Sequence, residues 1–516
     1  MHIGIIGGGA AGLAAAWQLS KRYDVTLYER NDWLGGHTRT VDVPTPKGSI
    51  PVDMAFVMYQ EWVYTNFSAL LDAIGVESVA TPLQTISVNF PGGAWISGRS
   101  TPFWKTIETD ANRFQSALPR IIADPARYAR MSLGDYLFGD SYSSDFVYKC
   151  VCPIGGSRFV TRRGVLSLSV LEFAAGFGPA PLFSVVHPTP WRTVRNGMRE
   201  YIRRLAEGFQ DRIRLSTPVI SIARNSRGVL VRDAQGRQEK FDHVILATPA
   251  DAALKLMEDP TPEERLLLAT DYQDARVILH RDASAMPKDR SLWAAETYVT
   301  TETTPPYQHG WSNYYLPATQ PWVEEDVFVT ISPPEGLIDP AKIIEERHWR
   351  HLVADSLQLL RAMELHRIQG TRHTWFCGEY AGMYGGHESS VVTGLAVARA
   401  LGAPYPFEDD AAARRVFYDT AVTHMRLLGD RPPEAAATWW PPVLAQTNAA
   451  VMRNIAREEV RNALRERIPA PFRLLLRPLG RLEEIVVNTV ASRISLVEEA
   501  SKAQKVGQEE VVSDTH

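Results

Sequence analysis

The stretch HIGIIGGGAAG, residues 2–12, decides the fold of this chain. Its first five residues are mostly apolar and β-branched, which predicts a short buried strand of a parallel sheet. The glycines that follow have the spacing Gly-x-Gly-x-x-Gly at Gly7, Gly9 and Gly12, and an alanine-rich segment predicts a helix up to residue 20. A second apolar segment, residues 23–28, predicts another strand and is followed by Glu29. This order of elements predicts a βαβ unit that binds a dinucleotide.

The residues of this pattern have separate physical roles. Gly7 allows the tight turn after the strand, Gly9 lets the backbone approach a pyrophosphate, and Gly12 permits close packing of helix on strand. The helix N-terminus offers free N–H groups and the positive end of its dipole to the phosphates. Glu29 stands about 20 residues further along, where a carboxylate accepts hydrogen bonds from a ribose.

A second pair of glycines, Gly35 and Gly36, follows within residues 30–40, RNDWLGGHTRT. Here the sequence resembles the flavin-containing amine oxidase and phytoene desaturase superfamily, in which such a pair and a polar run wrap the FAD diphosphate. Residues 52–56 resemble the next segment of that superfamily, which passes beside the isoalloxazine ring; relatives usually carry glycine where this chain has Ala55. The resemblance implies that the cofactor is FAD.

Later blocks extend this resemblance over about residues 1–402. Residues 195–201 open a predicted helix, and in the predicted strand over 213–223 the resemblance places the backbone of Val219 against the adenine. Residues 375–395 resemble the C-terminal FAD motif, in which a helix that begins near Ser389 points its N–H groups at the flavin N1/O2 edge. The pattern and the resemblance together assign these residues to cofactor binding: Gly7, Gly9, Ala10, Ala11, Gly12, Glu29, Arg30, Gly35, Gly36, His37, Thr38, Met54, Ala55, Phe56, Val219, Gly378, Glu379, Glu388, Ser389, Ser390 and Val391.

Within the superfamily, the chain is most similar to bacterial predicted FAD/NAD-binding oxidoreductases that are associated with fatty-acyl lipid modification. The marks of this similarity include Gly-Gly-His-Thr at 35–38, Trp-Arg-Thr-Val at 191–194 and Thr-Trp-Phe-Cys-Gly at 374–378. The resemblance implies an FAD-dependent oxidoreductase that removes or relocates a hydride on a hydrophobic, fatty-acyl substrate and so forms or shifts a C=C bond. Such an enzyme is a dehydrogenase (desaturase) or a double-bond isomerase.

Two alternative functions remain open. One is a flavin amine oxidase, although amine oxidases carry an aromatic residue where this chain has Gly386. The other is a non-catalytic FAD-binding subunit of a lipid-modifying complex. His387 and Tyr384 are the candidate catalytic residues, because they stand beside the flavin-facing helix start; Tyr59 and Tyr380 are weaker candidates. The alternative to a catalytic role for His387 is a structural one, in which it forms a hydrogen bond to FAD or to the backbone.

The expected fold is α/β. A Rossmann-like FAD-binding domain of the glutathione-reductase-2 type is assembled from residues 1–90, 195–250 and 370–402, and it is interleaved with an α+β substrate domain from residues 91–194 and 251–369. In the substrate domain we expect strands at 275–280, 293–300 and 327–331, then a helix over about 340–360. Its aromatic residues either line a cavity or fill the core: Trp293, Tyr298, Trp311, Tyr314 and Tyr315.

Composition sets limits on partners and location. The chain has 516 residues and a formal net charge of −4, which argues against nucleic-acid binding by the whole molecule. With only 3 Cys and no spacing typical of a metal site, a reduced cytoplasmic protein without metal is expected. Residues 403–516 predict a helical, arginine-rich extension, either a solvated cap or a contact for an anionic membrane surface or acidic partner. The arginines concerned are Arg453, Arg457, Arg461, Arg465, Arg473, Arg477 and Arg481.

Overall fold

A five-stranded parallel sheet forms the nucleotide-binding half of the fold. The computed structural model describes residues 1–83, 85–97, 101–128, 130–158, 165–177, 191–300, 310–353, 356–382 and 386–429. The sheet has the order β19-β13-β1-β2-β9, and each neighbouring pair is parallel. Its strands are β1 (His2–Ile6), β2 (Asp24–Tyr28), β9 (Ile213–Arg214), β13 (His243–Leu246) and β19 (Thr374–Phe376). Segments far apart in the chain therefore share one sheet, and the predicted α/β fold class is confirmed.

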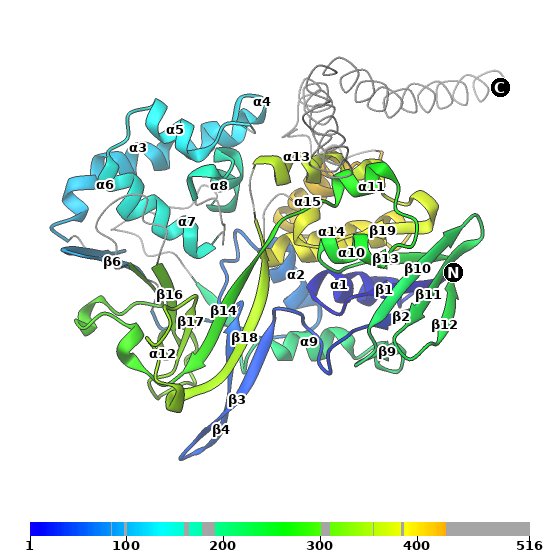
Figure 1. Ribbon diagram of the computed structural model, residues 1–516, viewed down its shortest axis with the longest axis horizontal. Helices are drawn as coiled ribbons and strands as arrows, with labels where there is room; N and C mark the ends of the chain where they lie inside the picture. Colours follow the sequence, from blue (N-terminus) through cyan, green and yellow to red (C-terminus); the bar gives the residue numbers. More distant parts are fainter. Residues whose placement is uncertain are drawn as a thin grey trace, which may run out of the picture. The chain divides into compact units, whose positions relative to one another are not determined.

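Helices pack on this sheet and enclose a large core cluster. Figure 1 shows α1 (Ala10–Leu19), α14 (Gly386–Ala400) and α10 (Ala250–Leu256) beside β1 and β13. A Cβ atom at Gly394 of α14 would lie 2.3 Å from the carbonyl oxygen of Ala11 on α1, so the two helix backbones are in close contact. The remaining helices of this half are α2 (Thr65–Ala73), α9 (Arg199–Ala206) and α15 (Ala411–Tyr418).

A seven-stranded sheet of order β18-β14-β17-β16-β15-β6-β7 forms the other half of the fold. Neighbouring strands are antiparallel except β6 and β15, which are parallel. Its strands are β6 (Ile86–Phe90), β7 (Gly93–Ile96), β14 (Tyr272–His280), β15 (Glu296–Thr300), β16 (Gly310–Tyr315), β17 (Phe328–Ile331) and β18 (Ile343–Leu352).

The predicted helix over about 340–360 is wrong. Residues 343–352 form the strand β18, which pairs with nearly the whole of β14, and the helix α13 begins only at Ser356 and ends at Glu364. Charged residues with good helix propensity fill this strand and hide its alternation. Cross-strand pairing and ion pairs such as Arg276 with Glu346 at 2.8 Å stabilise the strand instead.

Smaller elements complete the described fold. Short antiparallel sheets are formed by β3 (Arg39–Thr45) with β4 (Gly48–Ala55), by β5 (Ser78–Ala80) with β8 (Arg192–Val194), and by β10 (Val219–Asn225), β11 (Gly228–Asp233) and β12 (Gln238–Phe241). A helical layer lies beside the seven-stranded sheet in Figure 1. It consists of α3 (Trp104–Ala123), α4 (Pro125–Tyr128), α5 (Leu133–Gly139), α6 (Ser144–Phe146), α7 (Cys152–Arg158) and α8 (Val170–Phe177). Two further short helices are α11 (Pro262–Leu267) and α12 (Leu316–Thr319), the second of which lies between β16 and β17 in the chain.

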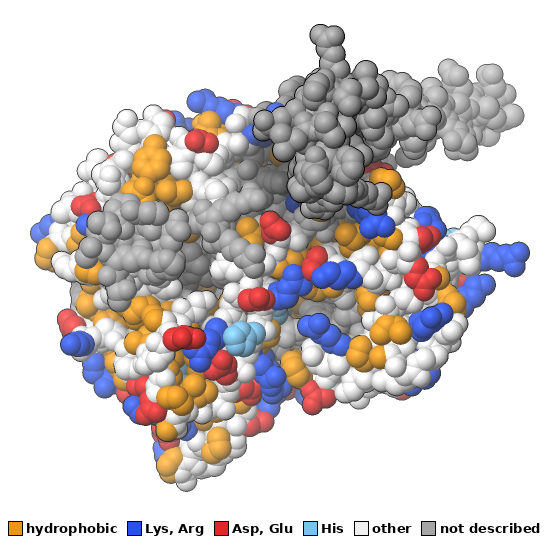
Figure 2. Space-filling model, viewed as in Figure 1, with side chains coloured by type: hydrophobic (Ala, Val, Ile, Leu, Met, Phe, Trp, Pro, Cys, Tyr) orange, Lys and Arg blue, Asp and Glu red, His pale blue; other side chains and the backbone are white. Residues whose placement is uncertain are grey.

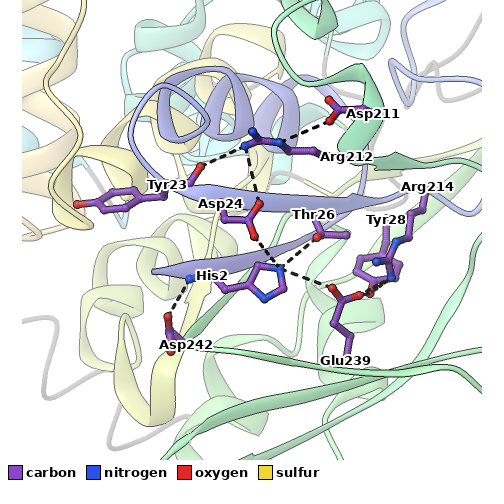
Figure 3. Close-up of polar contacts among 10 residues, drawn as sticks. All are labelled: His2, Tyr23, Asp24, Thr26, Tyr28, Asp211, Arg212, Arg214, Glu239 and Asp242. Carbon is purple, nitrogen blue, oxygen red and sulfur yellow. Dashed lines mark hydrogen bonds and ion pairs between the residues drawn. The ribbon is translucent and has the colours of Figure 1, made fainter.

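Polar contacts connect the strands β1, β2 and β9 of the parallel sheet to β12, as Figure 3 shows. The imidazole of His2 lies 3.6 Å from the carboxylate of Glu239 and 3.8 Å from that of Asp24. The hydroxyl of Tyr28 donates to Glu239 at 2.7 Å, and Arg214 donates to the same hydroxyl at 2.6 Å. These contacts hold the end of β2, and therefore the adjoining Glu29, in a fixed place.

Charge is mixed over the described surface. On the face drawn in Figure 2, basic and acidic side chains are interspersed, in agreement with the small net charge. None of the helices in the described ranges combines the length and apolarity that a bilayer crossing requires. The seven arginines predicted to contact a membrane or partner lie outside the described residues, so that prediction is untested.

Candidate cofactor and substrate site

A pocket of about 1020 Å³ opens where the two halves of the fold meet. Its walls come from the carboxyl ends of the parallel strands, from the start of α14 and from one face of the seven-stranded sheet. In open α/β sheets, ligands bind in the crevice at the carboxyl ends of the strands. The pocket therefore has the position expected of the cofactor site.

The first glycine turn fits a pyrophosphate. A Cβ atom at Gly9 would meet no other atom within 4 Å, so open space of the pocket lies against the Gly9 backbone. A Cβ atom at Gly12 would lie 2.0 Å from the carbonyl oxygen of Gly7, so only glycine permits this close packing. The two glycines serve different purposes: one leaves room for a ligand, and the other closes the turn.

The second glycine pair lies directly beside the first. Gly35 donates its backbone N–H to the oxygen of Gly8 at 2.8 Å, and Gly9 and Gly35 form a parallel bridge. Both glycines of the pair have positive φ, 115° at Gly35 and 62° at Gly36, where other residues are strained. The two segments therefore form one continuous wall along which a diphosphate can lie.

Glu29 occupies the ribose end of this wall. One carboxylate oxygen accepts the Gly8 N–H at 2.8 Å and the other accepts the Asn31 N–H at 2.9 Å. The side chain is buried among protein atoms and still lines the pocket. Each carboxylate oxygen has a further lone pair, which suits it to a ribose hydroxyl.

Glu388 attaches the start of α14 to the first turn of α2 through hydrogen bonds. Glu388 Oε1 accepts the backbone N–H of Asn66 at 2.7 Å, and Oε2 accepts that of Phe67 at 3.0 Å. These are free N–H groups of the first turn of α2, whose N-cap residue Tyr64 provides no side-chain cap. Burial raises the pKa of Glu388 to about 7, against the lowering effect of these hydrogen bonds. Glu388 thus caps α2 and holds α14 in place; its carboxylate does not line the pocket.

His387, the next residue back, lies in an aromatic enclosure. Its ring stacks on Phe56 with a centroid distance of 3.8 Å and an interplanar angle of 14°, and the edge of Phe67 approaches at 4.8 Å. The hydroxyl of Tyr201 lies 2.9 Å from His387 Nε2. Burial, followed by the charge of His37, lowers the pKa of His387 to about 3, so the imidazole is neutral at ordinary pH.

Two further histidines line the pocket close to one another. The rings of His37 and His351 have centroids 5.0 Å apart, and His37 keeps exposed surface and lines the pocket although protein surrounds it. Burial, His351 and Arg30 lower the pKa of His37 to about 3, and burial lowers that of His351 to about 4. Both are therefore neutral hydrogen-bonding groups. Within the described residues, no group of three metal-binding side chains is found.

One face of the seven-stranded sheet lines the other part of the pocket. Tyr298 and Glu296 of β15 lie opposite Val88 and Ile86 of β6, and Glu296 also lies opposite Tyr314 of β16. All five side chains line the pocket. Val277 of β14 and Ile331 of β17 belong to the same sheet and also line the pocket. Apolar groups from other elements join them, namely Val57, Met58, Pro153, Ile154 and Trp191.

The aromatic residues predicted for this region divide between the two expected roles. Tyr298 and Tyr314 line the pocket. Trp293 donates its ring N–H to the oxygen of Pro287 at 2.8 Å and is half-buried, whereas Trp311 donates to the oxygen of Ala285 at 2.9 Å and is buried. Tyr315 stacks on Phe328 and donates its hydroxyl to Asp326 at 2.8 Å.

Most residues assigned from the sequence line this single pocket. They are Gly7, Gly9, Ala10, Ala11, Glu29, Arg30, Gly35, Gly36, His37, Thr38, Met54, Ala55, Phe56, Val219, Gly378, Glu379, His387 and Ser390. Gly12, Glu388, Ser389 and Val391 are beside it but not among its lining residues. Tyr384 lies outside the described residues, Tyr380 lines the pocket, and Tyr59 is buried and is not among the lining residues.

Sequence reasoning missed several residues of the site. Tyr64 lines the pocket, and its hydroxyl would lie 3.9 Å from a Cβ atom placed on Gly386. His351 reaches the pocket from β18, the strand that was predicted as a helix. Tyr201 stands in a block that had been singled out as a helix start, but only its contact with His387 shows its importance.

Comparisons with known proteins agree with this geometry. The family model described as "Flavin containing amine oxidoreductase" matches residues 10–280, more than half of the chain. Among solved structures, a putrescine oxidase variant is similar with a TM-score of 0.61 and 16% identity, covering 78% of this chain and 98% of that chain. A CLA-producing fatty acid isomerase from P. acnes has a TM-score of 0.59 and 17% identity, covering 77% of this chain and 98% of that one. A reduced UDP-galactopyranose mutase has a TM-score of 0.57 and 17% identity, covering 81% of this chain and 98% of that one. The chain belongs to the flavin-containing amine oxidoreductase family, and FAD is its cofactor.

Proposed function

We propose that this FAD-dependent oxidoreductase acts on a hydrophobic, fatty-acyl substrate and forms or shifts a C=C bond in its chain. The observation that carries the proposal is the apolar part of the pocket beyond the cofactor wall. Met58, Ile86, Val88, Ile154 and Ile331 contribute to it from separate elements. An extended hydrocarbon chain would bury its surface there at about 25 cal/mol per Å².

The ring-side residues favour a substrate other than a simple amine. Position 386, where amine oxidases carry an aromatic residue, is glycine with a φ of 60°. Among the described residues, the side chain of Tyr64, the N-cap residue of α2, approaches this position. The ring centroids of Phe56 and Tyr64 are 5.7 Å apart, and Phe56 stacks on His387, so the aromatic groups here pack against one another. This arrangement supports a site that orients an apolar chain by shape.

FAD, when bound, supplies the two-electron chemistry of such a reaction. The protein must then orient the chain and exclude water. Tyr298, Tyr314 and Trp191 provide wide, rigid walls for that purpose. The isomerase from P. acnes offers a parallel, since the same fold accommodates a fatty acid in that protein.

Lipid extraction with mass spectrometry tests the proposal directly. Full-length protein purified with its cofactor should release FAD and, above the level of a matched control purification, acyl lipids. A cofactor-loaded protein that releases no acyl lipid and takes up none from added fatty acids would contradict the proposed substrate. Specific release or uptake of an amine would instead favour amine oxidation.

The proposal also has a consequence for location. A cytoplasmic enzyme that is peripheral to the inner face of the membrane would have direct access to acyl chains. Its contact would be the arginine-rich segment between Arg453 and Arg481.

A further inference from the structure

Three polar side chains form a hydrogen-bonded line behind the wall of the cofactor pocket, from Thr38 through Tyr201 to His387. The hydroxyl of Thr38 lies 3.3 Å from that of Tyr201, which lies 2.9 Å from His387 Nε2. Tyr201 is fully buried on α9, whereas His387, at the start of α14, and Thr38, which is itself buried, both line the pocket. The two residues are 186 positions apart, so the contact belongs to the folded protein alone.

The hydroxyl protons decide the direction of this line. Burial raises the pKa of Tyr201, so the phenol keeps its single proton and donates one hydrogen bond. If Tyr201 donates to His387 Nε2, Thr38 donates in turn to Tyr201, and both hydroxyl protons have acceptors. In the reverse direction the proton of Thr38 has no acceptor among the described residues and would depend on a bound ligand, since Thr38 lines the pocket. The first arrangement is favoured, because it pairs both buried hydroxyl protons within the protein, and buried polar groups are nearly always hydrogen-bonded.

This direction fixes the tautomer of His387. An imidazole that accepts at Nε2 and is neutral carries its proton at Nδ1. Among the described residues, Nδ1 has no hydrogen-bond partner, and it is not one of the fully buried unpaired atoms. Because His387 lines the pocket, its Nδ1–H is available to a bound ligand.

The surroundings of the ring keep this donor in one orientation. Phe56 covers one face of the imidazole at 3.8 Å, and Phe67 meets it edge-on at an interplanar angle of 83°. Phe56 itself has a φ of 50°, a left-handed conformation that costs energy for a residue other than glycine. Strain of this kind persists where the surrounding structure requires it, and here it brings the Phe56 ring onto His387.

We propose that Tyr201 is a positioning residue that holds His387 as a neutral Nδ1–H donor toward the flavin end of the bound FAD. When flavin is reduced, negative charge collects at the N1/O2 edge of its ring system. A fixed hydrogen-bond donor near that edge stabilises the reduced form. The proposal requires only that FAD is bound, so it stands or falls independently of the substrate proposed above.

Equilibration of the holoprotein with a redox dye tests this role without any substrate. In Tyr201→Phe, His387 is free to change tautomer, so the ratio of reduced to oxidised flavin at a fixed dye ratio should fall about tenfold, the size of one charge-assisted hydrogen bond. Tyr23→Phe is the matched control, because it removes a tyrosine hydroxyl bonded to the Leu401 oxygen at 3.0 Å, away from the pocket. The control should leave the ratio unchanged. An unchanged ratio in Tyr201→Phe would overturn the proposal.

A second pair of variants tests the tautomer even if Tyr201→Phe does not fold. The amide nitrogen of asparagine stands near the place of Nδ1, and that of glutamine near the place of Nε2. His387→Asn should therefore keep the reduced-to-oxidised ratio within about threefold of wild type, whereas His387→Gln should lower it about tenfold. Equal ratios in the two variants, or the opposite order, would overturn the assignment of the proton to Nδ1.

Discussion

Glu388 accepts two hydrogen bonds from Asn66, one from its backbone N–H at 2.7 Å and one from its side-chain amide at 3.1 Å. The two residues are 322 positions apart, and both are buried. Tyr405 completes the cluster by donating its hydroxyl to the Asn66 side-chain oxygen at 2.7 Å. Through this contact the first turn of α14, which bears His387, is held against the first turn of α2.

Removal of the Glu388 carboxylate should destabilise the protein strongly. In Glu388→Ala the N–H groups of Asn66 and Phe67 lose their acceptor in a buried place, which costs about 2–4 kcal/mol of unfolding free energy. Denaturant unfolding of the apoprotein measures this loss. The matched control is Glu77→Ala, since Glu77 pairs with Arg195 on the surface and its loss should cost less than about 1 kcal/mol. Equal losses in the two variants would show that Glu388 does not cap α2.

Substitution of the two motif glycines should separate cofactor binding from folding. The methyl group of Gly9→Ala projects into open pocket, so the apoprotein should keep wild-type stability within about 1 kcal/mol while FAD affinity falls at least tenfold. The methyl group of Gly12→Ala meets the oxygen of Gly7, so this variant should lose about 2 kcal/mol or more of stability. Thermal unfolding of the apoproteins and FAD titration measure the two effects. If Gly9→Ala is the less stable of the pair, the assignment of roles is wrong.

Asp53 should make stability decrease with rising pH. Burial raises its pKa to about 7, although Thr40, Met198 and Gln320 donate hydrogen bonds to it. Because this value lies above that of an unfolded aspartate, the folded protein holds an extra proton between about pH 4 and pH 7. The contribution of Asp53 to the unfolding free energy therefore falls through that window, by about 1 kcal/mol per pH unit.

Denaturant unfolding at pH 5 and pH 8 isolates this contribution. Wild type should lose about 2 kcal/mol more than Asp53→Asn over the interval. Asp42→Asn is the control, because Arg199 lowers the pKa of Asp42 and its titration is complete below pH 5. The same pH dependence in wild type and Asp53→Asn would contradict the raised pKa.

A larger side chain at Ile154 should shorten the acyl chain that the enzyme prefers. Ile154 is buried on α7 and lines the pocket beside the seven-stranded sheet. Ile154→Trp fills part of that space, so activity with long chains should fall at least tenfold relative to shorter ones. Ile154→Leu conserves volume and should keep the wild-type preference. Steady-state rates over a series of chain lengths give the answer, and an unshifted preference in Ile154→Trp would place the chain elsewhere.

The cofactor half of the site could be predicted because its determinants are close together in the sequence. The turn from Gly7 to Gly12 and the carboxylate of Glu29 follow local rules of backbone geometry and helix dipoles. Gly35 follows within a few residues, and the bridge between Gly9 and Gly35 needs no distant partner.

The rest of the site depends on contacts between distant segments. No feature of the sequence near Tyr201 indicates that its hydroxyl contacts His387. The sequence assigns Glu388 to cofactor binding, whereas in the structure its carboxylate accepts hydrogen bonds from Asn66. The strand β18 was missed because its pairing with β14 overrides the helix propensity of its charged residues. Its residue His351 was missed with it.

Anaerobic reduction of the bound flavin is the most direct measurement of the central claim. Holoprotein with oxidised FAD should lose its visible flavin absorbance when mixed with fatty-acyl lipids, lastingly if the enzyme forms a C=C bond and transiently during turnover if it shifts one, and should keep it when mixed with amines. Gly9→Ala protein, with weakened FAD binding, is the control for bleaching by free flavin. Flavin that is reduced by amines and not by any acyl lipid would contradict the account.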